Sequence, residues 1–166
     1  MCFILDIITL TSSLNWKGKA MKEFYMNEAI KEANRALELK EVPVGAIIVK
    51  DNKIVSRAHN LKETLKDPSA HAEILAIRKA CEALNNWRLT GCKMYVTLEP
   101  CPMCASAISQ ARISRLYIGT FDPTAGGCGS VIDIINDYHL NYKTQLEWMY
   151  DERCSRLLKE FFKKRR

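Results

Sequence analysis

Two short segments of this chain contain side chains suited to metal chemistry, namely His71-Ala72-Glu73 and residues 100–104, Pro-Cys-Pro-Met-Cys. Imidazole and thiolate groups bind zinc. A structural zinc site is closed by four protein ligands, whereas a catalytic one uses three and keeps a position for water. Zinc lowers the pKa of such a water to about 7. We therefore predict one Zn²⁺ held by His71, Cys101 and Cys104, with Glu73 as the catalytic acid–base group rather than a ligand.

The spacing within each motif favours the start of a helix. Cys101 and Cys104 are three residues apart, so their thiols lie on one face of a first turn, and prolines flank that turn. The partial positive charge of a helix N-terminus lowers the pKa of thiols there. His71 and Glu73 are about 200° apart around a regular helix, so their side chains can converge only at a point beyond the N-terminal end of that helix. A redox Cys-x-x-Cys would leave the histidine and the glutamate without a role.

The elements that must position these motifs are read from hydrophobic periodicity. The expected order is a helix over 21–40, strands 44–50 and 53–59 joined at Asp51-Asn52, a loop 60–69, a helix 71–84, a strand 94–98, a helix 101–110, a strand 116–119, a Gly-rich loop 122–130, a short helix 131–136, a strand 143–148 and a last basic helix. Strand–helix–strand connections of these lengths favour parallel pairing with right-handed crossovers. The fold class is therefore α/β, with three layers and a central mixed, mostly five-stranded sheet. Helices that begin at the carboxyl edge of parallel strands would aim both motifs into one crevice.

Length and composition indicate one globular domain in 166 residues. Residues 151–166 include seven basic and three acidic residues and so contribute +4 of the formal charge of +6. Such a tail suits a polyanion such as nucleic acid, or is a solvated face of an amphipathic helix.

The odd number of cysteines, seven, and the lack of a secretory signal favour the cytoplasm. Residues 1–20 are expected to be an N-terminal extension, non-native or disordered, with Met21 as the natural start and 21–166 as the single domain. We expect no membrane association and no organic cofactor.

Taken together, the two motifs resemble those of the cytidine deaminase-like zinc deaminases. Residues 21–166 are similar to the bacterial tRNA-specific adenosine deaminases, and the matching stretches are 41–46, 59–60, 68–73, 95–101, 119–130 and 161–166. This resemblance implies the cytidine deaminase-like fold and a homodimer with one zinc ion per subunit. It implies hydrolysis of adenosine to inosine at wobble position 34 in the anticodon loop of a tRNA, with release of ammonia. It also implies that Glu73 carries the proton and that Asn60, Ala72 and Asp122 bind the substrate.

Several assignments stay open at this stage. Asn60 and Asp122 are also common turn residues, and the Phe161-Phe162 pair could pack or stack on a splayed base. Glu99 is expected to be a supporting group, and Cys81, Cys128, His59 and His139 are not expected to be ligands. A deaminase of a free nucleobase or nucleoside, such as guanine or cytosine, would share the same four chemical residues. A non-catalytic zinc module that binds RNA would enclose the metal and leave Glu73 without a task.

Overall fold

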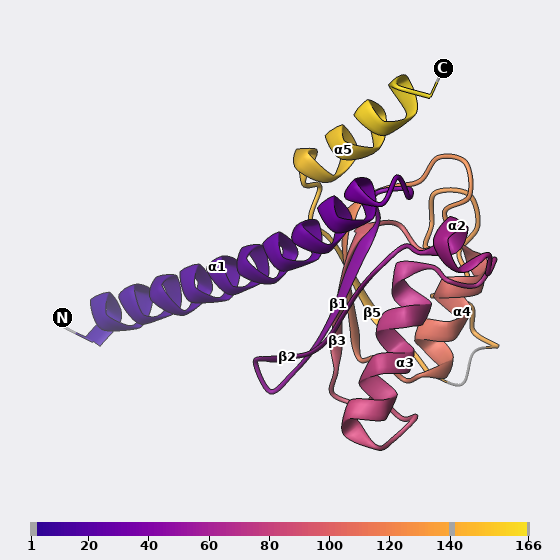
Figure 1. Cartoon of the computed structure of the whole chain (residues 1–166). Coiled ribbons are helices and arrows are strands. Elements are labelled where there is room, and N and C mark those ends of the chain that lie inside the picture. Colours follow the sequence, from indigo (N-terminus) through magenta and orange to yellow (C-terminus); the bar gives the residue numbers. More distant parts are fainter. Residues whose placement is uncertain (1–2, 140–141, 166) are drawn as a thin grey trace.

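The computed structural model describes residues 3–139 and 142–165 as one mixed sheet between two layers of helices (Figure 1). In chain order the elements are α1 (Phe3–Glu38), β1 (Gly45–Lys50), β2 (Lys53–His59), α2 (Lys62–Leu65), α3 (Ala72–Leu84), β3 (Lys93–Leu98), α4 (Pro102–Gln110), β4 (Arg115–Thr120), β5 (Gln145–Trp148) and α5 (Glu152–Lys163). The strand order is β2-β1-β3-β4-β5. β1 pairs antiparallel with β2 and β3, whereas β3, β4 and β5 run parallel. The three-layer α/β class and the five-stranded mixed sheet are confirmed.

The β1–β2 hairpin follows directly from its turn residues. Asp51 and Asn52 both have positive φ, 48° and 58°, which is the backbone of the tight two-residue turn that matches the twist of the strands. At the other end of β1, the backbone of α1 passes so close to Gly45 that a Cβ there would overlap the carbonyl oxygen of Ala29 and the amide nitrogen of Ala33. The hairpin is thereby held against α1.

Alternation along the central strands builds two cores, one on each face of the sheet. Ile48, Met94 and Val96 face α3 and α4, and they pack with the small residues of those helices, among them Ala72, Ala76 and Ala105. The opposite face consists of Ile47, Val49, Tyr95 and Tyr117, covered by Tyr25, Met26 and Ala29 of α1 and by Cys154 of α5. As a result α3 and α4 lie side by side in one layer, so that the two motifs can meet at their N-termini.

Three local expectations were wrong. α1 begins at Phe3 rather than at Met21, and its first part projects away from the sheet (Figure 1). The expected loop 60–69 contains the short helix α2. Segment 131–136 forms no helix, because its backbone bonds to the preceding loop: Ile134 N–H donates to Gly127 and Ile132 accepts from Gly129.

None of the helices in the described residues has the length and hydropathy required to cross a bilayer. The boundary between residues 20 and 21 stays a prediction, and Met1 and Cys2 lie outside the described residues.

Candidate metal centre

The predicted ligands lie at the starts of two neighbouring helices. His71 is the N-cap of α3 and Cys101 is the N-cap of α4, each with extended backbone (ψ 152° and 170°). Cys104 follows in the first turn of α4, where Pro102 occupies the first helical position. Because an N-cap residue points past the end of its helix rather than along its side, both caps direct their side chains into the gap above α3 and α4.

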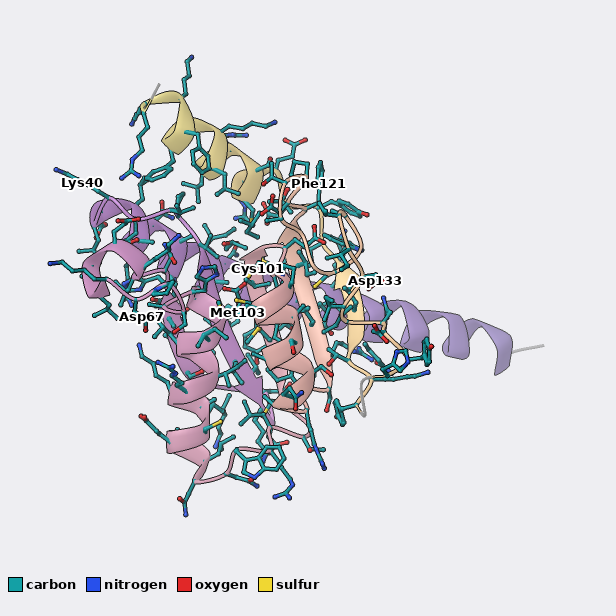
Figure 2. All side chains as sticks on the ribbon, turned by 90° about the vertical axis from the view of Figure 1, so that its right-hand side faces the viewer. Lys40, Asp67, Cys101, Met103, Phe121 and Asp133 are labelled. Carbon is teal, nitrogen blue, oxygen red and sulfur yellow. The ribbon has the colours of Figure 1, made fainter. Side chains whose placement is uncertain are left out.

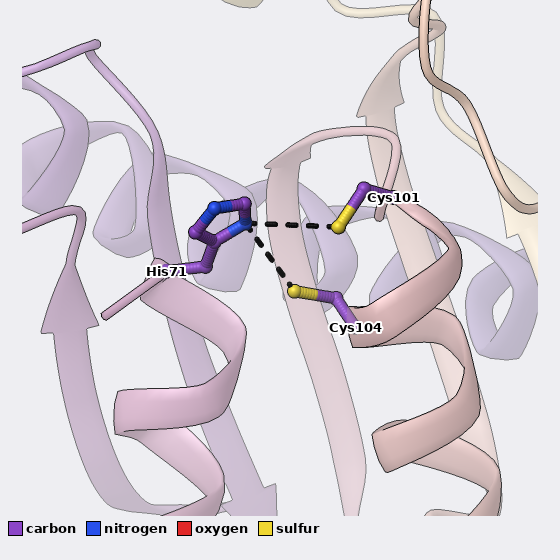
Figure 3. A group of neighbouring side chains, drawn as sticks. All are labelled: His71, Cys101 and Cys104. Atoms are coloured by element: carbon purple, nitrogen blue, oxygen red, sulfur yellow. Dashed lines mark hydrogen bonds between the residues drawn. The ribbon is translucent and has the colours of Figure 1, made fainter. Parts of the chain in front are cut away.

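The three side chains converge on one point, as Figure 3 shows. Nδ1 of His71 lies 3.7 Å from Sγ of Cys101 and 3.6 Å from Sγ of Cys104. These atoms lie within 4.8 Å of one another, and they form the candidate ligand group in the part of the chain that is described. Two sulfurs and one imidazole nitrogen are the donor set that zinc prefers, and a set of three leaves room for one more ligand. The residues present therefore fit a zinc ion of the catalytic kind.

The pKa shifts in this cluster also favour a bound cation. A hydrogen bond from Cys104 and another from His71 lower the pKa of the Cys101 thiol to about 4. The same contact with Cys101, together with burial, raises the pKa of Cys104, and the bond to Cys101 raises the pKa of His71. The shifts thus favour a thiolate at Cys101 beside protonated Cys104 and His71. His71, Cys101 and Cys104 would release their protons if they bound zinc.

Glu73 lies in the first turn of α3 beside this group and is only 4% exposed. Burial raises the pKa of its carboxyl to about 7, against the lowering effects of its own backbone N–H and of His71. A carboxyl group with such a pKa can both take and give a proton near neutral pH. Glu73 therefore has the burial and the position of an acid–base group.

A second buried carboxylate, Glu99, holds a loop against the metal-binding helix. It is 2% exposed, and its oxygens accept backbone N–H bonds from Asp122 (2.9 Å), Cys128 (2.9 Å) and Ser130 (3.1 Å). The loop is further tied down by a bond from Gly127 N–H to the carbonyl of Pro100, one residue before Cys101. The expectation that Glu99 is a supporting group agrees with these contacts, but its three partners could not be read from the sequence.

A groove of about 860 Å³ runs from this loop along α5. Exposed aromatic rings line it (Phe121, Tyr150, Phe162), and Asp122, Lys159 and Lys163 are among its polar residues. In Figure 2, Cys101 lies at the top of α4 beneath α5, and Phe121 lies near the base of α5. Of the Phe161-Phe162 pair, the first ring is 5% exposed and packs, whereas the second is 51% exposed. The groove was not predicted from the sequence, because its walls come from segments that are far apart in the chain, namely residues 42, 98, 120–124 and 150–163.

Residues 19–120 match the model of the cytidine and deoxycytidylate deaminase zinc-binding region. The chain is 50% identical over 145 residues to the tRNA-specific adenosine deaminase of Aquifex aeolicus, covering 87% of this chain and 96% of that protein. It is 45% identical to the enzyme of the same name from Bacillus subtilis, covering 87% and 90% of the two chains. The chain belongs to the tRNA-specific adenosine deaminases.

Solved structures agree with this membership. A tRNA:A34 deaminase that edits A to I at the wobble position of tRNA superposes with a TM-score of 0.79 at 42% identity, over 82% of this chain and 99% of that one. The guanine deaminase of Bacillus subtilis gives a TM-score of 0.57 at 39% identity, over 60% and 64% of the two chains. This chain thus shares part of its fold and sequence with a guanine deaminase.

In this member of the tRNA-specific adenosine deaminases, the three expected substrate-binding residues lie in different surroundings. Asn60 is buried and its Nδ2 donates to Glu41. Ala72 is fully buried in the core, so that only its backbone is available to a ligand. Asp122 makes the expected turn, accepting from Thr124 N–H at 2.9 Å, and it also lines the groove.

Proposed function

We propose that this chain is a zinc-dependent hydrolase that converts adenosine at wobble position 34 of a tRNA to inosine and releases ammonia. The observation that carries the proposal is the three-ligand group of His71, Cys101 and Cys104 beside the buried Glu73. It occurs in a chain that is half identical to a tRNA-specific adenosine deaminase.

Zinc, when bound by these three residues, supplies an activated water at neutral pH. Glu73 would accept a proton from the attacking water as the water oxygen bonds to C6, and it would pass this proton to a ring nitrogen of the adenine. It would then take the proton of the new C6 hydroxyl and give it to the amine, so that the C6–N bond breaks, one water enters and one ammonia leaves. Asn60, the backbone of Ala72 and Asp122 hold the base and its ribose in place. Burial of Glu73 keeps bulk water from competing for its proton.

The groove favours RNA over a free base. Sequence-specific readers of RNA splay out bases and stack them on aromatic rings, and basic side chains pair with the phosphates between them. Phe121, Tyr150 and Phe162 supply exposed rings, and Lys159 and Lys163 supply the charge along the same groove. A free base has no group that would use this surface.

We extend the proposal to a homodimer in the cytoplasm that binds the anticodon loop and needs no organic cofactor. The family resemblance supports the dimer. Free thiols at six cysteines of the described residues are compatible with a reducing compartment. Light scattering of the purified chain tests the oligomeric state.

The decisive experiment incubates the zinc-loaded protein with an anticodon stem-loop that has adenosine at position 34, and it measures inosine by sequencing and ammonia release. The variant Glu73→Gln should retain zinc and lose about 10²–10⁴-fold in rate, or about 3–5 kcal/mol of barrier. Activity on the stem-loop should fall steeply with added salt. Salt-insensitive turnover of free guanine or cytidine, with no inosine in the stem-loop, would replace this proposal by a small-molecule deaminase. Full activity of Glu73→Gln would remove Glu73 from the mechanism.

A further inference from the structure

We propose that Glu41 is a positioning residue that fixes which way the side-chain amide of Asn60 faces, and that it thereby sets the hydrogen-bonding pattern offered to the substrate base. The inference deepens the proposed function, because it rests on Asn60 as a substrate-binding residue. Glu41 lies in neither of the two zinc motifs and is not a predicted ligand. Its role follows from where its two oxygens lie.

Glu41 is completely buried just after α1. Its backbone N–H donates to the carbonyl of Ala36 in the last turn of α1, which places the side chain. One carboxylate oxygen accepts from Nδ2 of Asn60 at 3.1 Å, and the other accepts from the backbone N–H of Thr64 in α2 at 2.6 Å. Both oxygens of Glu41 are therefore committed to donors.

A side-chain amide has two orientations of nearly equal shape, and its neighbours decide between them. A carboxylate has no proton to donate, so Asn60 must turn its NH₂ group toward Glu41. The carbonyl oxygen Oδ1 is thereby directed elsewhere, and no donor among the side chains of residues 18–139 and 142–165 pairs with it. Asn60 thus presents an acceptor and one remaining N–H in a fixed arrangement.

The position of Asn60 connects this arrangement to the zinc site. The backbone N–H of the next residue, Leu61, donates to the carbonyl of Ala70 at 3.0 Å, and Ala70 directly precedes the ligand His71. The backbone N–H of Asn60 itself bonds to Val44 at the start of the hairpin. With backbone and amide both fixed, a base that offers its donor and acceptor in the reverse order meets two like groups. Such mismatches are costly, because they leave buried polar groups unpaired.

The test replaces Glu41 by glutamine, which has nearly the same shape but both donates and accepts hydrogen bonds. In Glu41→Gln, one of the two former acceptors becomes an NH₂ group, and Asn60 can reverse its amide to accept from it. We expect kcat/KM on the adenosine-34 stem-loop to fall about 10- to 100-fold, with zinc content unchanged. The matched control, Glu63→Gln on the exposed face of α2, should leave kcat/KM unchanged.

The double variant Glu41→Gln/Asn60→Asp separates positioning from simple stability. The introduced amide at position 41 can then donate to the introduced carboxylate at position 60, so the buried pair is kept with its polarity reversed and the melting temperature should stay close to that of wild type. The side chain at position 60 now offers the substrate acceptors only, and kcat/KM should stay low. In an Asn60→Ala background, Glu41→Gln should cause no further loss of kcat/KM.

The outcomes are distinguishable. If wild-type protein makes no inosine in the stem-loop, the proposed function fails. If wild type is active and Glu41→Gln is equally active, only the role of Glu41 fails. A wild-type kcat/KM together with a wild-type melting temperature in the double variant would show that Glu41 supports the fold alone, and would also overturn the inference.

Discussion

Removal of the Glu99 carboxylate should loosen the loop 121–130 at the start of the metal-binding helix, and the size of the effect can be worked out from the three hydrogen bonds that Glu99 accepts. Of the three donors, Cys128 is buried, whereas Ser130 is exposed and Asp122 is intermediate. In Glu99→Ala, water can reach the last two N–H groups, but that of Cys128 is left without a partner. Loss of one buried N–H bond to a charged acceptor costs about 1.5–3 kcal/mol, and each of the others about 1 kcal/mol. The free energy of unfolding should therefore fall by about 3–5 kcal/mol.

Glu99→Gln should be milder. The amide oxygen can keep the bonds to Cys128 and Ser130, which share one carboxylate oxygen, while its NH₂ group faces the N–H of Asp122. We expect a loss of about 1–2 kcal/mol, together with faster proteolysis near Asp122 and a higher KM for the stem-loop.

Urea unfolding of the zinc-loaded variants measures the free energy of unfolding, which should fall more in Glu99→Ala than in Glu99→Gln. Glu82→Ala on the exposed face of α3 is the control. Equal stability of the alanine and glutamine variants would refute the reasoning, because it would mean that the carboxylate does not discriminate among its donors. So would a loss below about 0.5 kcal/mol in both, the usual effect of a surface substitution.

Two further substitutions and the removal of the metal test other parts of the structure. Gly45→Ala should destabilise the protein by several kcal/mol or prevent soluble expression, since its Cβ would overlap the backbone of Ala29; a melting temperature within about 2 °C of wild type, on the order of 0.5 kcal/mol, would contradict this. Asp151→Ala should cost about 1 kcal/mol in urea unfolding by removing the N-cap of α5. Because hydrogen bonds from Arg153 hold the pKa of Asp151 below its usual value, this contribution is present above pH about 4 and should disappear as the pH falls through the lowered value. Chelation should abolish deamination and lower the melting temperature, and zinc retained after dialysis should decrease as the pH falls, because protons compete for the imidazole and the thiols.

The sequence was most informative where a local rule sufficed. The Asp51-Asn52 turn and the starts of α3 and α4 depend on neighbours in the chain, and each was predicted correctly. Segment 131–136 misled, because its apolar pattern suits a helix while its backbone bonds to the loop before it.

The supporting carboxylates were beyond local reasoning for another reason. Glu41 and Asn60 are 19 residues apart, and Glu99 bonds to residues 23 to 31 positions away. Only the assembled sheet brings these pairs together, and nothing in the type of a single glutamate tells a buried acceptor from a solvated surface charge. Burial of a carboxylate with every oxygen committed to a donor is visible only in three dimensions.

The placement of α5 has a consequence for how such a protein can diversify. The predicted zinc ligands and Glu73 lie within residues 71–104, whereas one wall of the groove is α5, which follows the last strand of the sheet. Changes in α5 can therefore alter the shape and charge of the groove without moving the predicted zinc ligands or Glu73. The predicted catalytic residues can stay constant while the side chains that line the groove change.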